Sequence, residues 1–247
     1  STDDGIEIID ISDPTNPTSV GRLGEADDTS RELDGAKGIA IETINGTPYA
    51  IVGSLTDNGI EIIDISDPTN PTSVGRMDDG TDTGRCTVAN GEKCLEKAKG
   101  VRTTTINDKT YVIVSGQDDD GIEIIDISDP TNPTSVGRLT ETDDTNRELD
   151  GAKGVAIETI NGTPYAVVGS MHDDGIQIID ISDPTNPTAV GSLDDTDGGI
   201  KDTGECTVEE RCLEGAKGVA IETINGTPYA FVAGQDDDGI EIIDISD

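Results

Sequence analysis

Basic residues are scarce in this chain, and their scarcity excludes several classes of partner. The 247 residues include 16 lysines and arginines against 52 aspartates and glutamates, which gives a formal net charge of −36. Nucleic acids and anionic membrane surfaces are polyanions and would repel such a chain. We therefore expect neither a nucleic-acid partner nor direct membrane insertion, whereas cations and basic partners should be attracted.

Long apolar runs are missing as well. A membrane-spanning helix needs about 20 consecutive apolar residues, and the sequence contains no such run and no recognisable signal peptide. Hydrophobic residues make up 32% of the chain, but they are concentrated in short Ile and Val runs between turn formers, with 30 Gly and 11 Pro. This patterning can build a packed core, so we expect a folded all-β chain rather than disorder.

The usual signatures of an enzyme are also absent. His172 is the only histidine and lies in an acidic loop, so the sequence offers neither a histidine metal triad nor a Cys-His pair. No G-x-S-x-G elbow, no Gly-rich phosphate loop before a helix and no helical periodicity occur. Paired carboxylates abound, but their very number singles out no glycosidase-like pair. The sequence therefore predicts a protein that is not an enzyme.

Cysteine is limited to four residues, which occur as two local pairs. Cys86 lies close to Cys94, and Cys206 lies close to Cys212. The spacings within the pairs are unequal, and the chain lacks the further ligands that a zinc site needs. Two disulfides, each closing a loop, are the better interpretation. They predict an oxidising compartment, and hence an extracellular or cell-surface location.

Internal repetition dominates the rest of the sequence. The string GIEIIDISD occurs four times and a near copy, GIQIIDISD, once, and the steps between copies alternate between short and long. The segments 3–13 and 237–247 are identical. The five copies begin at Gly5, Gly59, Gly121, Gly175 and Gly239. Repetition of this kind is the signature of a repeat architecture.

One repeat unit reads as four strands, here called A to D. The pattern predicts strand A from Ala36, strand B from Thr47, strand C from Gly59 and strand D from Thr72. Asn-Gly between A and B is the strongest signal of a two-residue hairpin. The Asp-Pro-Thr-Asn-Pro link between C and D predicts a rigid turn. Strand C is apolar at both parities, which predicts burial on both faces, as in stacked blades.

The composite pattern AKG[IV]A…YA[IV]V…GIEIIDISDPTNPTSVG resembles the LVIVD repeat of secreted and surface proteins. The resemblance covers essentially the whole chain. It implies an all-β fold of β-propeller type, with about four four-stranded antiparallel blades. The long acidic loops between strands D and A depart from the usual, shorter repeat.

We expect a single β-propeller-like repeat domain over residues 1–247. It would comprise a C–D half-blade at 1–23, repeat units at about 34–77, 96–139 and 150–193, and a closing A–B–C segment at 214–247. One C strand is then left over. It is either unpaired or paired with a neighbouring molecule by strand addition, or the chain is a window cut from a longer array. Self-association through the repeat ends or this spare strand is therefore expected.

Up-and-down strand order places the B–C and D–A loops together, and these loops collect the acidic residues. Calcium takes about six to eight oxygen ligands, which clustered carboxylates on turns can supply. The alternative is a solvated acidic surface suited to high salt. The candidate ligands are Asp78, Asp79, Asp82, Asp118, Asp119, Asp120, Asp195, Asp197, Asp202, Asp236, Asp237 and Asp238.

Three asparagines, Asn45, Asn161 and Asn225, lie in Asn-Gly-Thr sequons and are candidates for N-glycosylation. No organic cofactor is expected. Together the patterns favour a non-enzymatic extracellular structural or adhesive protein, a building unit of a cell-surface layer or filament with a cation-binding acidic face. The alternative is a monomeric secreted β-propeller that binds calcium or a ligand.

Overall fold

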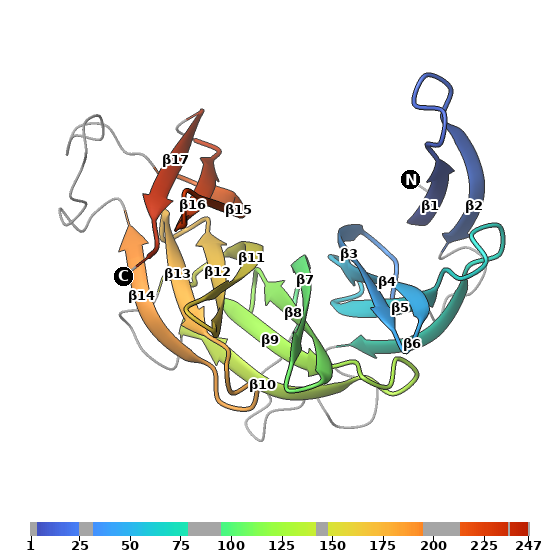
Figure 1. The fold of residues 1–247 in the computed structure, drawn as a ribbon, viewed down its shortest axis with the longest axis horizontal. Coiled ribbons are helices and arrows are strands. Elements are labelled where there is room, and N and C mark those ends of the chain that lie inside the picture. Colours follow the sequence, from blue (N-terminus) through green and yellow to red (C-terminus); the bar gives the residue numbers. More distant parts are fainter. Residues whose placement is uncertain are drawn as a thin grey trace. The chain divides into compact units, whose positions relative to one another are not determined.

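The computed structural model describes residues 4–24, 32–78, 95–141, 148–194, 213–236 and 238–246. Within these residues the chain forms 17 β-strands in five antiparallel sheets, whose strands follow one another in chain order (Figure 1). No helix in the described part of the chain is long and apolar enough to cross a membrane.

We number the sheets as blades 1 to 5 in chain order. Blade 1 has two strands, β1 (Gly5–Asp10) and β2 (Thr18–Gly24). Blade 2 comprises β3 (Ala36–Ile44), β4 (Thr47–Ser54), β5 (Gly59–Asp64) and β6 (Thr72–Asp78). Blade 3 comprises β7 (Ala98–Ile106), β8 (Lys109–Gly116), β9 (Gly121–Asp126) and β10 (Thr134–Thr140). Blade 4 comprises β11 (Ala152–Ile160), β12 (Thr163–Ser170), β13 (Gly175–Asp180) and β14 (Thr188–Asp194). Blade 5 has three strands, β15 (Ala216–Ile224), β16 (Thr227–Gly234) and β17 (Gly239–Asp244).

The expected fold class is confirmed, with one difference in the number of blades. The sheets are antiparallel, and a complete blade has four strands. We expected about four blades, whereas the structure has five sheets. The difference arises because the C–D pair of blade 1 and the A–B–C strands of blade 5 each form a separate, incomplete sheet.

The chain divides into two compact units. The first comprises Ser1–Val112 with Ile125–Ser135, and the second comprises Ile113–Ile124 with Val136–Asp247. Blade 3 contributes strands to both units. Every contact between blades described below lies within one unit.

The A–B hairpins have the geometry that Asn-Gly predicts. Asn45 and Gly46 have φ angles of 52° and 84°, so both residues occupy the left-handed region. A two-residue type I′ turn needs positive φ at both central positions, which Asn and Gly tolerate. Asn161-Gly162 and Asn225-Gly226 repeat the same angles within a few degrees.

The C strands carry the core of the complete blades. In β5 the side chains of Ile60, Ile62 and Ile63 are fully buried, as expected for a strand that is apolar on both faces. The same sequence in β17 behaves differently, because Ile240 is 72% exposed and Ile242 is 57% exposed. Burial of strand C therefore depends on the sheets and strands beside it as well as on its own sequence.

Candidate functional site

Aspartates in the B–C loops of blades 2 and 4 accept hydrogen bonds from backbone N–H groups elsewhere in the same blade. In blade 2 the carboxylate of Asp57 accepts a hydrogen bond from the backbone N–H of Asp34 at 2.6 Å. In blade 4 Asp173 accepts from the N–H of Asp150 at the same distance. In both blades this hydrogen bond ties the B–C loop to the residues just before strand A of the same blade. Burial raises the pKa of both carboxyls, an effect that these hydrogen bonds oppose.

In blades 2, 3 and 4 the last residue of the B–C loop forms a hydrogen bond with the segment that leads into the next blade. These residues have φ between 50° and 57°, a left-handed conformation that Asn and Asp tolerate. The bonds run from Lys97 N to Asn58 Oδ1 (2.9 Å), from Gly151 N to Asp120 Oδ1 (2.9 Å) and from Gly215 N to Asp174 Oδ1 (2.7 Å). Because the uncharged Asn58 fills the role, the position needs an acceptor oxygen and not a charge.

The described carboxylates do not form a calcium ligand set. Among these residues no group of three or more His, Cys, Asp or Glu side chains could hold a metal ion. Asp120 is engaged with the next blade, and Asp236 accepts from Gln235 Nε2 at 3.2 Å. Asp78, Asp118, Asp119 and Asp238 also lie among the described residues, whereas Asp79, Asp82, Asp195, Asp197, Asp202 and Asp237 lie outside them. Calcium binding stays a prediction.

A buried carboxylate pair lies under the loops of blade 2. Glu61, in the middle of β5, is 0% exposed. Its carboxylate accepts the backbone N–H of Glu32 at 3.0 Å and the hydroxyl of Ser73. Burial, reinforced by the charges of Asp78 and Asp57, raises the pKa of Glu32 to about 8. At neutral pH the carboxyl group of Glu32 is therefore mostly protonated and uncharged.

In blade 4 the position that corresponds to Glu61 carries the amide side chain of Gln177. Gln177 replaces Glu61, and its Oε1 accepts the N–H of Glu148 at 3.1 Å while its Nε2 donates to the carbonyl of Gly191 at 2.6 Å. Burial and the nearby Asp173 and Asp194 raise the pKa of Glu148 to about 8. The residue opposite also changes, from Arg76 facing Glu61 to Ser192 facing Gln177.

Three of the four Asp-Pro-Thr-Asn-Pro turns, those of blades 2, 3 and 4, pack on a glycine of strand D in the preceding blade. We call the surface around this glycine a turn seat. A Cβ built on Gly75 would overlap the carbonyl oxygen of Pro130 and lie 3.3 Å from Pro133 Cδ. The seats at Gly21 and Gly137 repeat this contact with the turns of blades 2 and 4. Only glycine allows the two backbones to approach so closely.

The exposure of the two prolines differs between turns that pack on such a glycine and the turn of blade 1. In the turns of blades 3 and 4 both prolines are buried, and in the turn of blade 2 the second one, Pro71, is buried. In the turn of blade 1, Pro14 and Pro17 are both exposed. Among the turns that the structure describes, the turn of blade 1 is therefore the one whose two prolines are both exposed.

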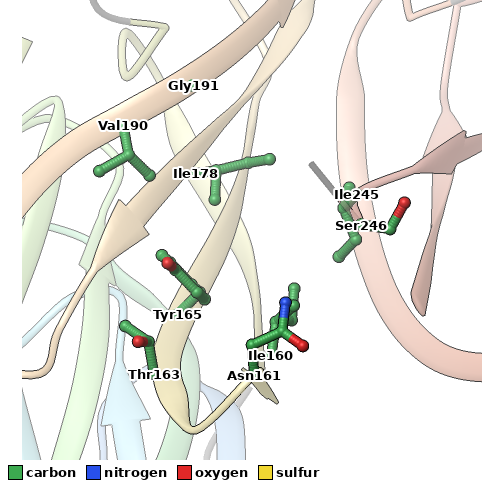
Figure 2. Close-up of a pocket in the computed structure, with 9 residues that line it drawn as sticks. All are labelled: Ile160, Asn161, Thr163, Tyr165, Ile178, Val190, Gly191, Ile245 and Ser246. Carbon is green, nitrogen blue, oxygen red and sulfur yellow. The ribbon is translucent and has the colours of Figure 1, made fainter. Parts of the chain in front are cut away.

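The fourth seat, at Gly191, holds no turn among the described residues of the second unit. Of these residues, a Cβ on Gly191 would meet Ile178 Cδ1 alone, at 3.9 Å. Val190, the extra residue of the bulge between β13 and β14, is 56% exposed. Around them lies a cavity of about 300 Å³, whose lining includes Tyr165 and Ile178 of blade 4 and Ile245 of blade 5 (Figure 2).

The other residues singled out in the sequence are the sequon asparagines, His172 and the four cysteines. Asn45, Asn161 and Asn225 are exposed in their turns, so the sequons are accessible. His172 Nδ1 lies 2.8 Å from Asp150 Oδ1, and both side chains are 47% exposed. Cys86, Cys94, Cys206 and Cys212 lie outside the described residues, so the two disulfides stay a prediction.

Sequence reasoning missed the buried Glu61 and the turn seats. Glu61 carried no signal of its own, because a glutamate in an Ile-rich strand reads as its one exposed position. A signal was present in the comparison of repeats, where Glu61 and Arg76 change together to Gln177 and Ser192. The seat glycine was visible as the constant Gly of the TSVG motif, but only the packing shows what approaches it.

Comparison with known families identifies the repeat. The LVIVD repeat model matches residues 2–24, 48–79, 110–141, 164–195 and 225–247. The three internal matches cover strands B, C and D of complete blades, whereas the A strands lie outside the matched segments. No curated protein sequence matches the chain significantly.

Solved structures share the fold at low sequence identity. A putative 6-phosphogluconolactonase from Bacteroides fragilis has a TM-score of 0.57 at 13% identity, covering 96% of this chain and 60% of its own. A protein from Lactobacillus plantarum has a TM-score of 0.55 at 14% identity, covering 100% and 65%. An exo-β-1,3-galactanase from Phanerochaete chrysosporium has a TM-score of 0.50 at 12% identity, covering 89% and 49%.

These likenesses show the fold alone, and the chain spans 49 to 65% of the length of those three structures. The matched repeats cover more than half of the chain and coincide with its blades. The repeats and the fold indicate a binding or structural module made of β-propeller-type blades, and the chain belongs to the LVIVD-repeat family.

Proposed function

We propose that this chain is a non-enzymatic structural unit that assembles outside the cell, in a surface layer or a filament. The observation that carries the proposal is the turn seat, which joins successive blades three times with the same geometry. Each contact is heterologous, because a turn on one blade meets a glycine on another. Heterologous contacts that do not close extend into open polymers.

The use of polar groups in the described loops supports a structural role. The carboxylates of Asp57, Asp120, Asp173 and Asp174 accept backbone N–H groups within a blade or between blades. The buried carboxylate Glu61 is used in the same way. These side chains stabilise loops, and the same position carries Asn58 in one blade without loss of the bond.

The charge of the chain supports assembly in a salty medium. A net charge of −36 makes copies repel one another, and this repulsion weakens as ionic strength rises. Cations gathered over the acidic loops would reduce it further. The two loop disulfides expected from the cysteine pairs fit an oxidising, extracellular setting.

Electron microscopy of the purified chain tests the proposal directly. In about 1 M NaCl, where charges are screened beyond ~3 Å, we expect regular fibres or sheets whose extent grows with protein concentration. Sedimentation velocity of the same samples measures the size distribution in solution. Discrete particles of one chain at every concentration would contradict the proposal.

A monomeric module that binds calcium or another ligand is the second candidate function. It is supported by the acidic side chains gathered near Glu32 and Glu148, Asp57 and Asp78 in blade 2 and Asp173 and Asp194 in blade 4, whose mutual repulsion a bound cation would relieve. Under this candidate, calcium at fixed ionic strength raises the melting temperature, and a chelator reverses the rise. Calorimetry without a binding heat, together with an unchanged melting temperature, would leave a solvated acidic surface.

A further inference from the structure

We propose that the second-to-last residue of strand B specifies how a blade joins strand A of the next blade, by packing when it is glycine and by a hydrogen bond when it is serine. The residue is Gly169 in blade 4 and Ser115 in blade 3. The inference goes beyond the proposed function, because it concerns how blades are joined within one chain. The contacts that carry it lie within the second unit.

Strand A is the same in the two joints. The strands β11 and β15 both have the sequence AKGVAIETI, so each offers the same side chains and carbonyl groups to the blade before it. The start of β11 contacts the end of β8, and the start of β15 contacts the end of β12. These two strands B differ at their ends, which read Ser-Gly in β8 and Gly-Ser in β12. The difference between the joints therefore comes from the preceding blade.

The joint between blades 4 and 5 is packed. A Cβ built on Gly169 would lie 3.0 Å from Val219 Cγ2, so the valine fills the space that a side chain would need. The joint between blades 2 and 3, in the first unit, repeats this contact, because a Cβ on Gly53 would lie 2.9 Å from Val101 Cγ2. Glycine thus brings a valine of the next strand A into the place of its missing side chain.

The joint between blades 3 and 4 has a hydrogen bond at the same position. Ser115 is fully buried, and its hydroxyl donates to the carbonyl oxygen of Lys153 at 2.5 Å. A buried hydroxyl needs such a partner. Val155, the residue of β11 that corresponds to Val219, is 1% exposed. Strand A is therefore buried in both joints, although strand B carries a side chain in only one of them.

The last residue of strand B explains why glycine and serine exchange places. In β12 the hydroxyl of Ser170 donates to the carbonyl of Glu148 at 2.5 Å, within its own blade. In β8 a Cβ on Gly116 would lie 2.7 Å from Asp119 Oδ2, so the B–C loop of blade 3 occupies that space. Successive side chains of a strand point to opposite sides. The serine therefore serves its own blade in one order and the next blade in the other.

Exchanging glycine for serine in blade 4 tests the rule, with alanine as the matched control. Gly169→Ser should be tolerated, because the new hydroxyl can donate to the carbonyl of Lys217, which corresponds to the acceptor of Ser115. Gly169→Ala crowds Val219 in the same way but supplies no donor. We expect amide hydrogen exchange in β15 to become about threefold faster at most in Gly169→Ser and about tenfold faster or more in Gly169→Ala.

The reverse exchange in blade 3 inverts an ordinary ranking. Glycine in a strand is usually less stable than alanine, because it loses more conformational freedom on folding. At position 115 we expect the opposite, with slower amide exchange in β11 for Ser115→Gly than for Ser115→Ala. Glycine lets Val155 move into the place of the lost side chain, whereas alanine keeps that space filled and supplies no donor to Lys153.

A double-mutant cycle isolates the packing contact. Val219→Ala removes the methyl group that lies nearest to Gly169, so it should relieve the crowding in Gly169→Ala. The effects of these two substitutions on exchange in β15 should therefore not multiply. Val101→Ala is the matched control, because it changes the corresponding valine of the other packed joint and should leave exchange in β15 unaltered.

The ranking within each pair of variants decides the proposal. Exchange that is as fast or faster in Gly169→Ser than in Gly169→Ala overturns it, and so does exchange as fast or faster in Ser115→Gly than in Ser115→Ala. Far-UV circular dichroism shows whether each variant folds, and an alanine variant that alone fails to fold supports the same ranking. Sedimentation of the unaltered chain measures self-assembly separately, so failure of this rule leaves the proposed function standing.

Discussion

The seats at Gly75 and Gly191 have the same local sequence, Val-Gly, and the same register on strand C, yet only one is filled. At Gly75 the turn of blade 3 packs so closely that no Cβ fits, whereas at Gly191 a Cβ would meet one distant methyl group. The difference teaches that the role of a residue in a repeat protein depends on its neighbour in the array. A glycine can be indispensable in one copy and replaceable in the next.

The interiors of the same two blades differ in chemistry. Blade 2 buries Glu61 opposite Arg76, and blade 4 buries Gln177 opposite Ser192. In both, the side chain accepts the backbone N–H of a glutamate that lies just before strand A of the same blade, Glu32 or Glu148. The hydrogen bond is thus retained while the charge is removed together with its cross-strand partner.

The largest expected effect comes from comparing Gly75→Ala with Gly191→Ala. Gly75→Ala should lower the free energy of unfolding by about 3 kcal/mol or more, because a new methyl group must displace the backbone of the seated turn. Gly191→Ala should leave it unchanged. Urea denaturation of both variants under identical conditions measures the difference, and equal losses would show that the seats are not packing sites.

The second prediction transfers the charge of blade 2 into blade 4. Gln177→Glu removes the donor to the Gly191 carbonyl and buries a carboxylate near Glu148, so we expect a loss of about 2–3 kcal/mol at neutral pH. Adding Ser192→Arg should recover part of this loss, since it restores the pairing of blade 2. A double-mutant cycle on unfolding free energies checks the coupling. Independent effects would contradict the paired exchange.

The third prediction concerns pH. The folded pKa of Glu32 and Glu148 is raised to about 8, above the ordinary 4.5, so the folded chain binds more protons between these values. Their contribution to stability is complete below about pH 4.5 and is lost as pH rises through 8. We expect the melting temperature to fall over this range.

The variant Glu32→Gln, compared with Glu148→Gln, tests this assignment to each blade. Each substitution should flatten part of the pH dependence, because an amide does not titrate. Below pH 4 the trend reverses, since hydrogen bonds from Thr15, Ser66 and Thr69 lower the pKa of Asp13, Asp64 and Asp67 and their contribution is lost as they protonate. A melting temperature independent of pH from 5 to 8 in the unaltered chain would contradict the burial of both glutamates.

The smallest effect is expected at the bond between blades 4 and 5. Asp174→Ala removes the acceptor for Gly215 N–H and should cost about 1 kcal/mol. Asp174→Asn should be neutral, because Asn58 makes the same bond in blade 2. Thermal melting of the two variants decides whether the carboxylate serves as an acceptor. A loss for Asn as large as for Ala would indicate that its charge matters.

The local structure could be predicted from the sequence with high accuracy. Strands A and B of blade 2 begin and end where the patterns at Ala36 and Thr47 place them, and Asn45-Gly46 forms the expected hairpin. Strands C and D of the same blade likewise begin at Gly59 and Thr72, the residues that the pattern predicts. These features depend on backbone preferences and alternation, which are encoded within a few residues.

The candidate sites were less predictable, because they depend on neighbours distant in sequence. The acids of the B–C loops suggested ligands, but the structure shows that Asp120 and Asp174 bind backbone N–H groups of the following blade. Strand patterning did not reveal that Glu61 is buried, since its environment comes from Glu32 and Ser73. Gly75 and Gly191 share the sequence Val-Gly, so the sequence around them did not reveal that their described neighbours differ.

The turn and its seat lie in the same repeat, separated by a few residues along strand D. Blades 1 to 4 each carry both a C–D turn and a strand-D glycine. A unit that brings its own turn and its own glycine can be added to such a row, or removed from it, without a new kind of contact having to arise.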